Sequence, residues 1–374
     1  MTSKMLFVDV SGFAVRRFRL PLIRELVGRG CHVTVASPHF DDEDRGPVMD
    51  AGADIRTYQL QRTGLNPLAD LESKRSLTRL FESVGPELVI CRAAKPVAHG
   101  LPMAARVGIP RRIGFMTGLG AMFYPRTAGE TMTAAVGRRL ITRGLKSATQ
   151  VWVLNEDNES RLRNSASHLR AKSIINLDSD GVDTTAFTPH PLPEKTTFGF
   201  IGRLLPAKGA RTFINAAVRM KQSGSSCRFL VAGEPDDHRD SIQKQEIHTL
   251  MDAGVIEYEG FVKDIGDFLA RCSALVLPSH HEGRSRSILE SLACGRPVLT
   301  TDAPGCHDAI EDGREGYVTR VGDVEGLVSR MQSIDQDPSM LESMSIASRR
   351  LAESRYEIEL VTNRMADQVV KASS

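Results

Sequence analysis

Two glutamates in the last third of the chain bracket a segment whose composition suits a phosphorylated ligand. Glu282 and Glu290 have seven residues between them, and a run from Gly283 to Ser287 begins the interval. This run follows an apolar, strand-like segment at residues 274–278 and leads into helical spacing. Free N–H groups at a helix start attract phosphate oxygens, and carboxylates accept hydrogen bonds from sugar and ribose hydroxyls. The segment therefore predicts a diphosphate cradle, although an isolated glutamate pair also fits an ordinary helix.

Two cations follow another buried strand. The apolar segment 198–201 ends at Gly202, and Arg203 and Lys208 follow at a spacing of five before the next helix. A departing phosphate needs positive charge beside the oxygen that becomes anionic, and arginine and lysine supply it as a fork and as a point charge. The pair predicts stabilisation of a diphosphate leaving group.

Together these two segments resemble the signature of retaining glycosyltransferase family four, whose GT-B architecture has two Rossmann-like domains facing across a cleft. The resemblance implies that Glu282 contacts the donor sugar, that Glu290 holds the nucleotide ribose, and that Arg203 and Lys208 meet the diphosphate. Arg203, Lys208 and Glu282 are the predicted catalytic residues. The complete predicted donor site consists of Gly12, Gly202, Arg203, Lys208, Gly233, Phe261, Val262, Glu282, Gly283, Ser285, Arg286, Ser287 and Glu290.

The same resemblance implies a reaction course. Sugar transfer proceeds with retention of anomeric configuration, and UDP is the nucleotide that we favour. No residue is a convincing covalent nucleophile, so we expect departure of the nucleoside diphosphate from the face that the acceptor attacks. No Asp-x-Asp pair stands at a strand end, since Asp178 and Asp180 fall in a turn-rich stretch. We therefore expect no metal ligand and no cofactor besides the nucleotide-sugar substrate.

The N-terminal half carries the expected acceptor site, which consists of Phe13, Arg16, Arg17, Lys95, Thr117 and Gly118. The segments around these residues resemble the subgroup that builds lipid-linked oligosaccharides and bacterial surface polysaccharides, so a polyprenyl-diphosphate-linked glycan is the expected acceptor. Many family members have a histidine in the loop after Ile113, where this chain has Thr117–Gly120, so no catalytic histidine is assigned. Arg126, Arg138, Arg139, Arg143 and Lys146 could form a basic face toward anionic lipid, or an ordinary solvated helix face.

The chain reads as two successive series of alternating strands and helices, which predicts an α/β fold with parallel sheets. Its 374 residues suit two domains. We expect an acceptor-binding Rossmann-like domain over residues 1–178, a nucleotide-sugar-binding one over 179–355, and a C-terminal helix, 356–374, packing back on the first. The stretch 178–193 is the expected hinge.

The amino-acid composition indicates where the protein acts and what kind of partner it binds. A hydrophobic fraction of 41% and a charged fraction of 25% are typical of soluble globular proteins, and no segment is apolar enough for a membrane span. The six cysteines are scattered, which favours buried reduced thiols. Residues 1–150 have 22 Lys and Arg against 13 Asp and Glu, which indicates an anionic partner. We expect a cytoplasmic enzyme at the inner face of the cell membrane, contacting anionic lipid.

Three alternatives remain open from the residues. A nucleotide-sugar 2-epimerase shares the architecture but lacks the segment from Glu282 to Val298. A dinucleotide-dependent oxidoreductase would need a GxGxxG loop after the first strand, which is absent here. A nucleic-acid or lipid-binding module fits the basic first half, but aromatic residues make up only 5% of the chain and no nucleic-acid motif is present.

Overall fold

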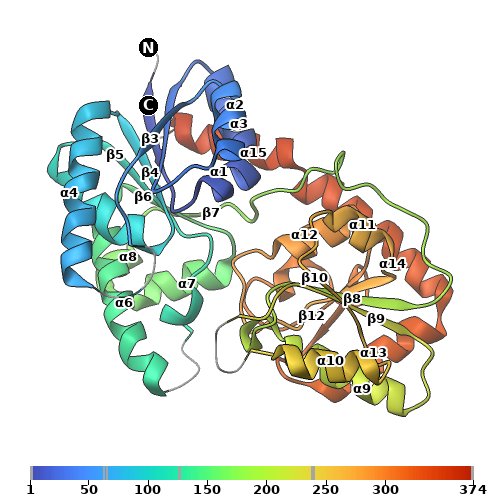
Figure 1. Cartoon of the computed structure of the whole chain (residues 1–374). Coiled ribbons are helices and arrows are strands. Elements are labelled where there is room, and N and C mark those ends of the chain that lie inside the picture. Colours follow the sequence, from blue (N-terminus) through green and yellow to red (C-terminus); the bar gives the residue numbers. More distant parts are fainter. Residues whose placement is uncertain (1–2, 62–63, 65, 125–127, 237–240, 372–374) are drawn as a thin grey trace. The chain divides into compact units, whose positions relative to one another are not determined.

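The computed structural model describes the chain except for residues 1–2, 62–63, 65, 125–127, 237–240 and 372–374. The chain divides into two compact units (Figure 1). One unit comprises the residues up to Asp180 together with those from Glu359 onwards, and the other comprises Gly181–Ile358. The first unit is therefore built from two stretches that lie at opposite ends of the sequence.

The described part of the first unit contains a seven-stranded parallel sheet in the order β3-β2-β1-β4-β5-β6-β7. Its strands are β1 (Lys4–Val8), β2 (His32–Ser37), β3 (Asp54–Thr57), β4 (Leu88–Arg92), β5 (Arg111–Phe115), β6 (Gln150–Val153) and β7 (Ile174–Asn176). Its helices are α1 (Gly12–Phe18), α2 (Leu20–Gly28), α3 (Asp42–Asp50), α4 (Pro67–Val84), the π-helical turn η1 (Pro96–Gly100), α5 (Leu101–Arg106), the 3₁₀ turn η2 (Gly120–Met122), α6 (Ala128–Lys146), α7 (Glu156–Ser165) and α8 (Ser167–Arg170).

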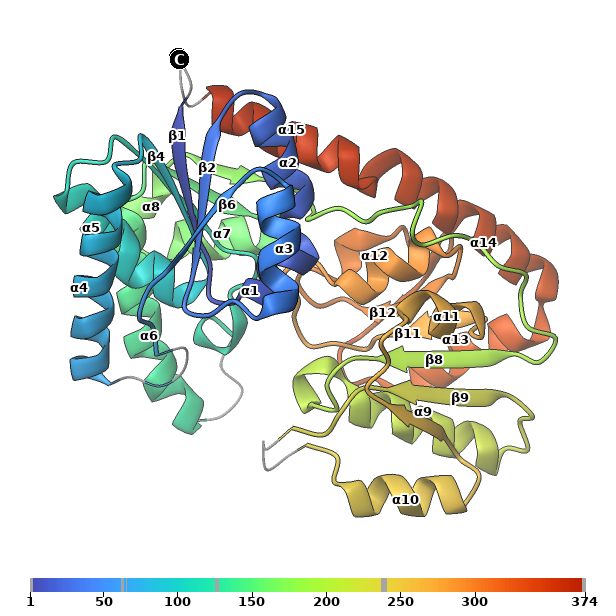
Figure 2. The ribbon, with the colours of Figure 1, turned by 45° about the horizontal axis from the view of Figure 1, so that its top comes forward.

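Helices cover both faces of this first sheet (Figure 2). The strands β1, β2 and β4 are apolar on both sides because each face is buried, as parallel sheets require, whereas the edge strand β3 is mostly exposed. One core cluster joins the sheet to α1, α2 and α3, and the other joins it to α4, α5 and α6. The C-terminal helix α15 (Ile358–Lys371) completes the first of these clusters with Val361, Met365, Ala366 and Val369.

The described part of the second unit contains a six-stranded parallel sheet in the order β10-β9-β8-β11-β12-β13. Its strands are β8 (Thr197–Ile201), β9 (Arg228–Ala232), β10 (Glu257–Gly260), β11 (Ala274–Val276), β12 (Val298–Thr301) and β13 (Gly316–Thr319). Its helices are the 3₁₀ turn η3 (Pro206–Lys208), α9 (Ala210–Gln222), α10 (Lys244–Asp252), α11 (Ile265–Ala270), α12 (Arg286–Ala293), the 3₁₀ turn η4 (His307–Ala309), α13 (Val324–Gln336), α14 (Pro338–Leu351) and the π-helical turn η5 (Ala352–Tyr356).

Two segments at the boundaries of the second unit are joined to each other. Val182 forms a parallel bridge with Glu357. The Val182 N–H donates to the Tyr356 carbonyl at 2.8 Å, and the Ile358 N–H donates to the Val182 carbonyl at 2.9 Å. The chain thus enters and leaves this unit along one short stretch of paired backbone.

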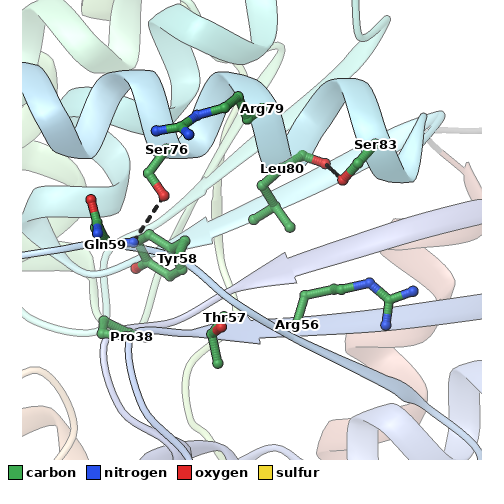
Figure 3. A pocket seen from close by; sticks show the side chains of 9 residues that line it. All are labelled: Pro38, Arg56, Thr57, Tyr58, Gln59, Ser76, Arg79, Leu80 and Ser83. Atoms are coloured by element: carbon green, nitrogen blue, oxygen red, sulfur yellow. Dashed lines mark hydrogen bonds between the residues drawn. The ribbon is translucent and has the colours of Figure 1, made fainter.

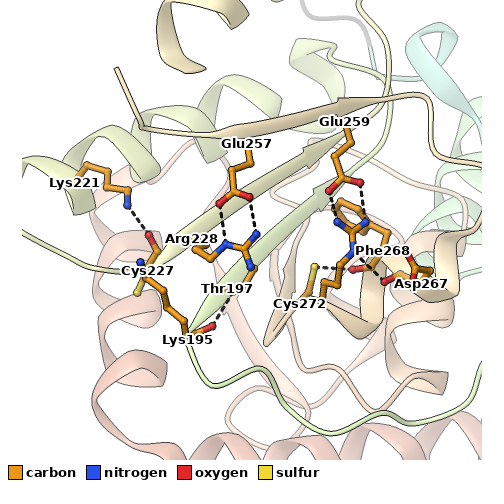
Figure 4. A network of polar contacts seen from close by, with 11 residues as sticks. Lys195, Thr197, Lys221, Cys227, Arg228, Glu257, Glu259, Asp267, Phe268 and Cys272 are labelled. Atoms are coloured by element: carbon orange, nitrogen blue, oxygen red, sulfur yellow. Dashed lines mark hydrogen bonds and ion pairs between the residues drawn. The ribbon is translucent and has the colours of Figure 1, made fainter. Parts of the chain in front are cut away.

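Ion pairs hold strand β10 at the edge of the second sheet (Figure 4). Glu257 accepts two hydrogen bonds from Arg228 of β9, at 2.8 and 2.6 Å, and this pairing lowers the pKa of the Glu257 carboxyl. Glu259, two residues on and so on the same face, receives both ends of Arg271 at 2.5 and 2.7 Å. These contacts fix the strand whose carboxyl end leads to Phe261.

The structure differs from the sequence analysis in several elements. The apolar spacing of residues 97–107 predicts a continuous α-helix, but the segment begins with the π-helical turn η1 before α5. Helix α3 was not expected, because it contains three acids in its first turn and Pro47 inside it. It forms because Val48 is buried and because Asp44 pairs with Arg16 at 2.7 Å. The cysteines, in contrast, agree with the sequence analysis, because all six are free thiols, five of them buried and Cys31 partly buried.

Candidate active site

Apart from Gly12, which lies in the first unit, the residues predicted for the donor lie at or near the carboxyl edge of the second sheet. Gly202 and Arg203 follow β8, Gly233 follows β9, and Phe261 follows β10. The segment from Glu282 to Ser285 lies between β11 and α12, and Arg286 and Ser287 are the first two residues of α12. The strand order reverses between β8 and β11, and ligands of open parallel sheets bind at such a point.

Glycines allow the loops at this edge to approach one another. Gly233 has a φ of +129°, and a Cβ atom there would lie 1.9 Å from the Gly202 carbonyl oxygen. Gly209 has a φ of +73°, and a Cβ atom there would lie 1.9 Å from the Pro278 carbonyl oxygen. Any larger residue would push the β8 loop, which carries Lys208, away from the end of β11.

Lys208 and Glu282 form an ion pair at this point. The Lys208 Nζ atom lies 2.7 Å from Oε1 and 2.8 Å from Oε2 of Glu282. Ser279 donates its hydroxyl to Glu282 Oε1 at 2.8 Å, and the Glu282 N–H donates to the Pro304 carbonyl at 2.8 Å. The Glu282 side chain is 9% exposed and that of Lys208 is 29% exposed. A cation and a carboxylate are thus held together at the carboxyl edge of the sheet.

Helix α12 begins directly after this pair. Ser285 is its N-cap residue, and the Ser285 side chain accepts no capping hydrogen bond. Ser287 donates its hydroxyl to the Ile201 carbonyl at 3.3 Å, which ties the start of the helix to the end of β8. Gly283 lies two residues before the cap. Its carbonyl oxygen would be 2.6 Å from a Cβ atom placed on Gly305, so the two loops are in close contact. The helix N-terminus therefore lies at the same edge as Lys208, where its dipole favours an anion.

Glu290 lies about one turn inside α12 and is buried. Its Oε1 atom lies 3.5 Å from the Arg286 guanidinium, which also donates to the Gly181 carbonyl at 3.2 Å. Arg286 thus connects the helix with the first residue of this unit.

The remaining donor-side residues are more exposed. Arg203 pairs with Asp236 at 3.0 Å, and 67% of its side chain is exposed. The Phe261 side chain is also 67% exposed, whereas Val262 packs against the core of the unit. A diphosphate ligand would therefore have to draw Arg203 away from Asp236.

In the first unit, a buried ion pair lies where the strand order reverses between β1 and β4. Asp9, which is fully buried, accepts hydrogen bonds from Arg92 Nε at 2.5 Å and Nη2 at 2.9 Å. The Arg92 Nη1 atom lies 3.4 Å from Thr117 Oγ1, and the exposed Gly118 follows. The pair connects the loops after β1, β4 and β5. The sequence analysis missed it, although Asp9 and Arg92 each stand at a strand end.

Other acceptor-side predictions are distributed over the same edge. Phe13 is half exposed, and the Arg16 guanidinium lies 5.5 Å from its ring centre. Arg17 is exposed. Lys95 pairs with Asp70 of α4 at 2.7 Å, beside the buried His99. Burial lowers the pKa of His99, although Asp70 acts in the opposite direction.

Gly12 makes room for protein atoms of its own unit. A Cβ atom there would lie 2.7 Å from a ring atom of Phe40 and 2.9 Å from the His39 carbonyl oxygen. The close packing of α1 on the loop after β2 accounts for a glycine at this position.

Arg284 and Asp308 support the segment between β11 and α12, and neither was predicted as a site residue. Arg284, whose side chain is fully buried, binds both carboxylate oxygens of Asp308 at 2.9 Å. Its guanidinium lies 5.9 Å from the ring centre of Tyr356, whose hydroxyl donates to the Ala309 carbonyl. A buried arginine within a polar run carries no sequence signal of its partner, because Asp308 lies 24 residues on.

The described residues include neither a metal-binding cluster nor a membrane-spanning helix. Among them, no group of three or more His, Cys, Asp and Glu side chains is arranged to hold a metal ion. No helix in that part of the chain is long and apolar enough to cross a membrane. Of the basic residues expected near lipid, Arg138, Arg139, Arg143 and Lys146 lie on α6, and Arg126 lies outside the described residues.

Comparisons with known proteins agree with this arrangement. The family model of the group 1 glycosyl transferases matches residues 195–337, which lie within the second unit. An undecaprenol-dependent α-1,3-N-acetylgalactosaminyltransferase from Campylobacter jejuni, which acts on N,N'-diacetylbacillosaminyl-diphospho-undecaprenol, is 24% identical, with 98% of each chain covered. The putative glycosyltransferase EpsD of Bacillus subtilis is also 24% identical, over 98% of this chain and 96% of its own.

Solved structures show the same fold over the whole chain. The Anabaena protein HepE, solved with UDP and glucose, superposes with a TM-score of 0.80 at 16% identity and covers 98% of this chain and 99% of its own. Sucrose-phosphate synthase from Thermosynechococcus elongatus has a TM-score of 0.81 at 17% identity, with both chains fully covered. The two parallel α/β sheets are those of the GT-B fold. Residues 195–337 therefore match the group 1 glycosyl transferases, and over its whole length the chain is similar to glycosyltransferases and has the GT-B fold.

Proposed function

We propose that this enzyme transfers a sugar from a UDP-sugar to a glycan linked to a polyprenyl diphosphate, in the synthesis of a surface polysaccharide or oligosaccharide. The observation that carries the donor half is the Lys208–Glu282 pair beside the start of α12, at the strand-order reversal of the second sheet. HepE, which shares the fold, was solved with UDP, and the Campylobacter relative is named for an undecaprenol-linked acceptor.

The proposed mechanism assigns each group one task. The diphosphate lies against the N-terminus of α12, with Lys208 and Arg203 neutralising the charge that develops as the sugar–phosphate bond breaks. Glu282 holds the donor sugar through its hydroxyls, and Glu290 holds the ribose. The departing phosphate oxygen accepts the proton of the attacking acceptor hydroxyl on the same face, so configuration is retained. Two cations and a helix dipole supply the positive charge, and we propose that transfer needs no metal ion.

Binding of nucleotides tests the donor half first. The purified protein would be heated with UDP, GDP, ADP or NAD in the presence of EDTA. A ligand at a hundred times its dissociation constant stabilises the fold by about 2.7 kcal/mol, which raises the unfolding temperature by a few degrees. We expect UDP to stabilise the wild type and not Glu290→Ala. Stabilisation by NAD alone, or by no nucleotide, contradicts the proposal.

Turnover then tests the reaction. A panel of UDP-sugars would be incubated in EDTA with and without a polyprenyl-diphosphate-linked glycan. We expect labelled sugar in the lipid-linked product only when acceptor is present. Conversion of the nucleotide sugar without acceptor would instead identify a 2-epimerase, and a requirement for added Mg²⁺ would contradict the metal-free mechanism.

The exposed apolar side chains of the first unit support contact with a membrane surface. Leu68, in the first turn of α4, is 79% exposed, and Met132 and Val136 of α6 are 80% and 50% exposed. Helices of a parallel α/β unit run against the strands, so both helices start at the carboxyl edge of the sheet, which also carries Thr117. We expect the protein to sediment with vesicles of anionic lipid. Met132→Gln with Val136→Gln should reduce that binding, and unchanged sedimentation would contradict it.

A further inference from the structure

A groove in the first unit lies outside every residue predicted for donor or acceptor. It has a volume of about 490 Å³ and runs between the edge strand β3 with its following residues and helix α4 (Figure 3). Thr57 ends β3, and Pro38 directly follows β2. The groove therefore opens at the carboxyl edge of the sheet, the edge at which ligands bind in this class of fold, and extends along β3 toward its amino end, where Arg56 and Ser83 also line a second, smaller pocket with Lys4 and His32.

The groove has a cation toward each end. Arg79 of α4 lies beside Ser76 and Gln59, whereas Arg56 of β3 lies farther along the strand (Figure 3). Both arginines are exposed, and within the described residues neither has a carboxylate partner. Arg56 donates only to the neighbouring Ile55 carbonyl, at 2.9 Å. No lining residue is acidic.

The lining between the two arginines is rich in neutral hydrogen-bonding groups. Ser76 Oγ accepts the Gln59 N–H at 2.9 Å, which leaves the hydroxyl hydrogen of Ser76 able to donate to a ligand. Thr57 and the Gln59 amide are exposed along the same wall. Leu80 is a buried apolar residue of the lining. Hydroxyl and amide groups over an apolar floor suit a sugar ring better than a lone inorganic ion.

A buried tyrosine connects this groove with the acceptor side of the unit. Tyr58 donates its hydroxyl to the Asp9 carbonyl at 2.8 Å, directly after β1. Burial raises the pKa of Tyr58 well above its ordinary value, so the hydroxyl stays a donor at neutral pH. Asp9 in turn binds Arg92, which reaches Thr117. The groove thus shares a rigid support with the proposed acceptor site.

We propose that this groove binds an acidic sugar unit of the glycan acceptor, with its carboxylate or phosphate groups paired to Arg79 and Arg56. The assignment of the ligand to the acceptor rests on the proposed function. A volume of about 490 Å³ has room for one or two sugar rings, within the range of ordinary ligand sites. Arginine forms two parallel hydrogen bonds to a carboxylate or phosphate, which gives the geometry for recognising an acid.

Calorimetric titration with a matched pair of disaccharides tests this proposal. Cellobiouronic acid and cellobiose differ by one carboxylate, and inorganic phosphate serves as the third probe. We expect the wild type to bind the acid at least tenfold more tightly than cellobiose or phosphate. Arg56→Gln with Arg79→Gln should remove that preference. Arg75→Gln is the matched control, because Arg75 is exposed on α4 and does not line the groove.

The outcomes separate this proposal from the proposed function. The proposal is overturned if the wild type binds cellobiouronic acid no more tightly than cellobiose or than phosphate. It is also overturned if the double variant keeps the preference for the acid. UDP binding is measured on the same variants and should be unchanged, because neither arginine lies in the unit that carries the donor site. If the variants lose acid binding but keep UDP binding, the defect lies in the groove alone. If UDP does not bind the wild type, the proposed donor site is wrong, whatever the groove binds.

Discussion

The Lys208–Glu282 pair gives the sharpest prediction, because its two members should affect UDP binding in opposite ways. In the structure the Lys208 ammonium is engaged by both oxygens of Glu282. Lys208→Met removes the charge that we assign to the diphosphate. Glu282→Gln leaves that charge and releases it from its carboxylate partner. UDP affinity should therefore fall in the first variant and be unchanged or higher in the second, while both lose sugar transfer.

The expected magnitudes follow from charge and burial. A hydrogen bond from an ammonium group to a phosphate contributes about 1.5–3 kcal/mol, so Lys208→Met should weaken UDP binding about 10- to 100-fold. Removing one partner of a fully buried pair costs about 3–5 kcal/mol of folding stability. Lys208 is partly exposed, so we expect about 2 kcal/mol for its loss. The double variant should be less destabilised than the sum of the two singles, by about 1–2 kcal/mol.

Two assays on four proteins check this reasoning. Titration calorimetry gives the UDP dissociation constants, and urea unfolding gives the stabilities of the wild type, both singles and the double variant. Additive stabilities would show that the pair has no coupling. Equal loss of UDP affinity in Lys208→Met and Glu282→Gln would refute the division of tasks between them.

Three further outcomes are expected. Arg92→Met leaves the buried Asp9 carboxylate without its guanidinium and should lower the free energy of unfolding in urea by about 3–5 kcal/mol. Adding Asp9→Asn to the same chain should restore part of that loss. Equal stability of Arg92→Met and the double variant would contradict this. Glu290→Gln should weaken UDP binding about tenfold with little change in unfolding temperature, measured by calorimetry and thermal melting. Because the pKa of His99 is lowered in the fold, stability is complete above about pH 6.5 and falls as the pH drops below it. His99→Gln should reduce that fall between pH 7 and pH 5, and an identical fall in both proteins would contradict it.

The alternation of strands and helices was readable because each strand of a parallel sheet is a short apolar run. β1 and β8, for example, are apolar over almost every residue. Elements whose stability comes from tertiary contacts were not readable. Helix α3 depends on Asp44 meeting Arg16, which lies 28 residues away, and no local pattern reports that contact. The π-helical turn η1 also interrupts a segment that has ordinary helical spacing.

In the donor site, the sequence analysis named residues that the structure brings to one sheet edge, but not how they interact. Lys208 and Glu282 lie 74 residues apart in sequence, so their ion pair could not be inferred from spacing. Ser279, which donates to Glu282, follows a strand and a proline and resembles an ordinary turn residue. In the first unit, Asp9 and Arg92 each end an apolar strand. A charged residue at such a position is a signal that could have directed attention to the strand-order reversal between β1 and β4.

The C-terminal helix has a consequence for the order in which the chain acquires structure during synthesis. Val361, Met365, Ala366 and Val369 fill one core cluster of a unit whose other residues are made first. A ribosome delivers these side chains last, so the nascent first unit carries an uncovered apolar surface while residues 181–358 emerge. The second unit is continuous in sequence and can complete its own core before release. Because synthesis runs from the N-terminus, the core of the first unit is completed only after α15 has been made. A chain that ends prematurely near residue 358 would expose that apolar surface to chaperones and proteases.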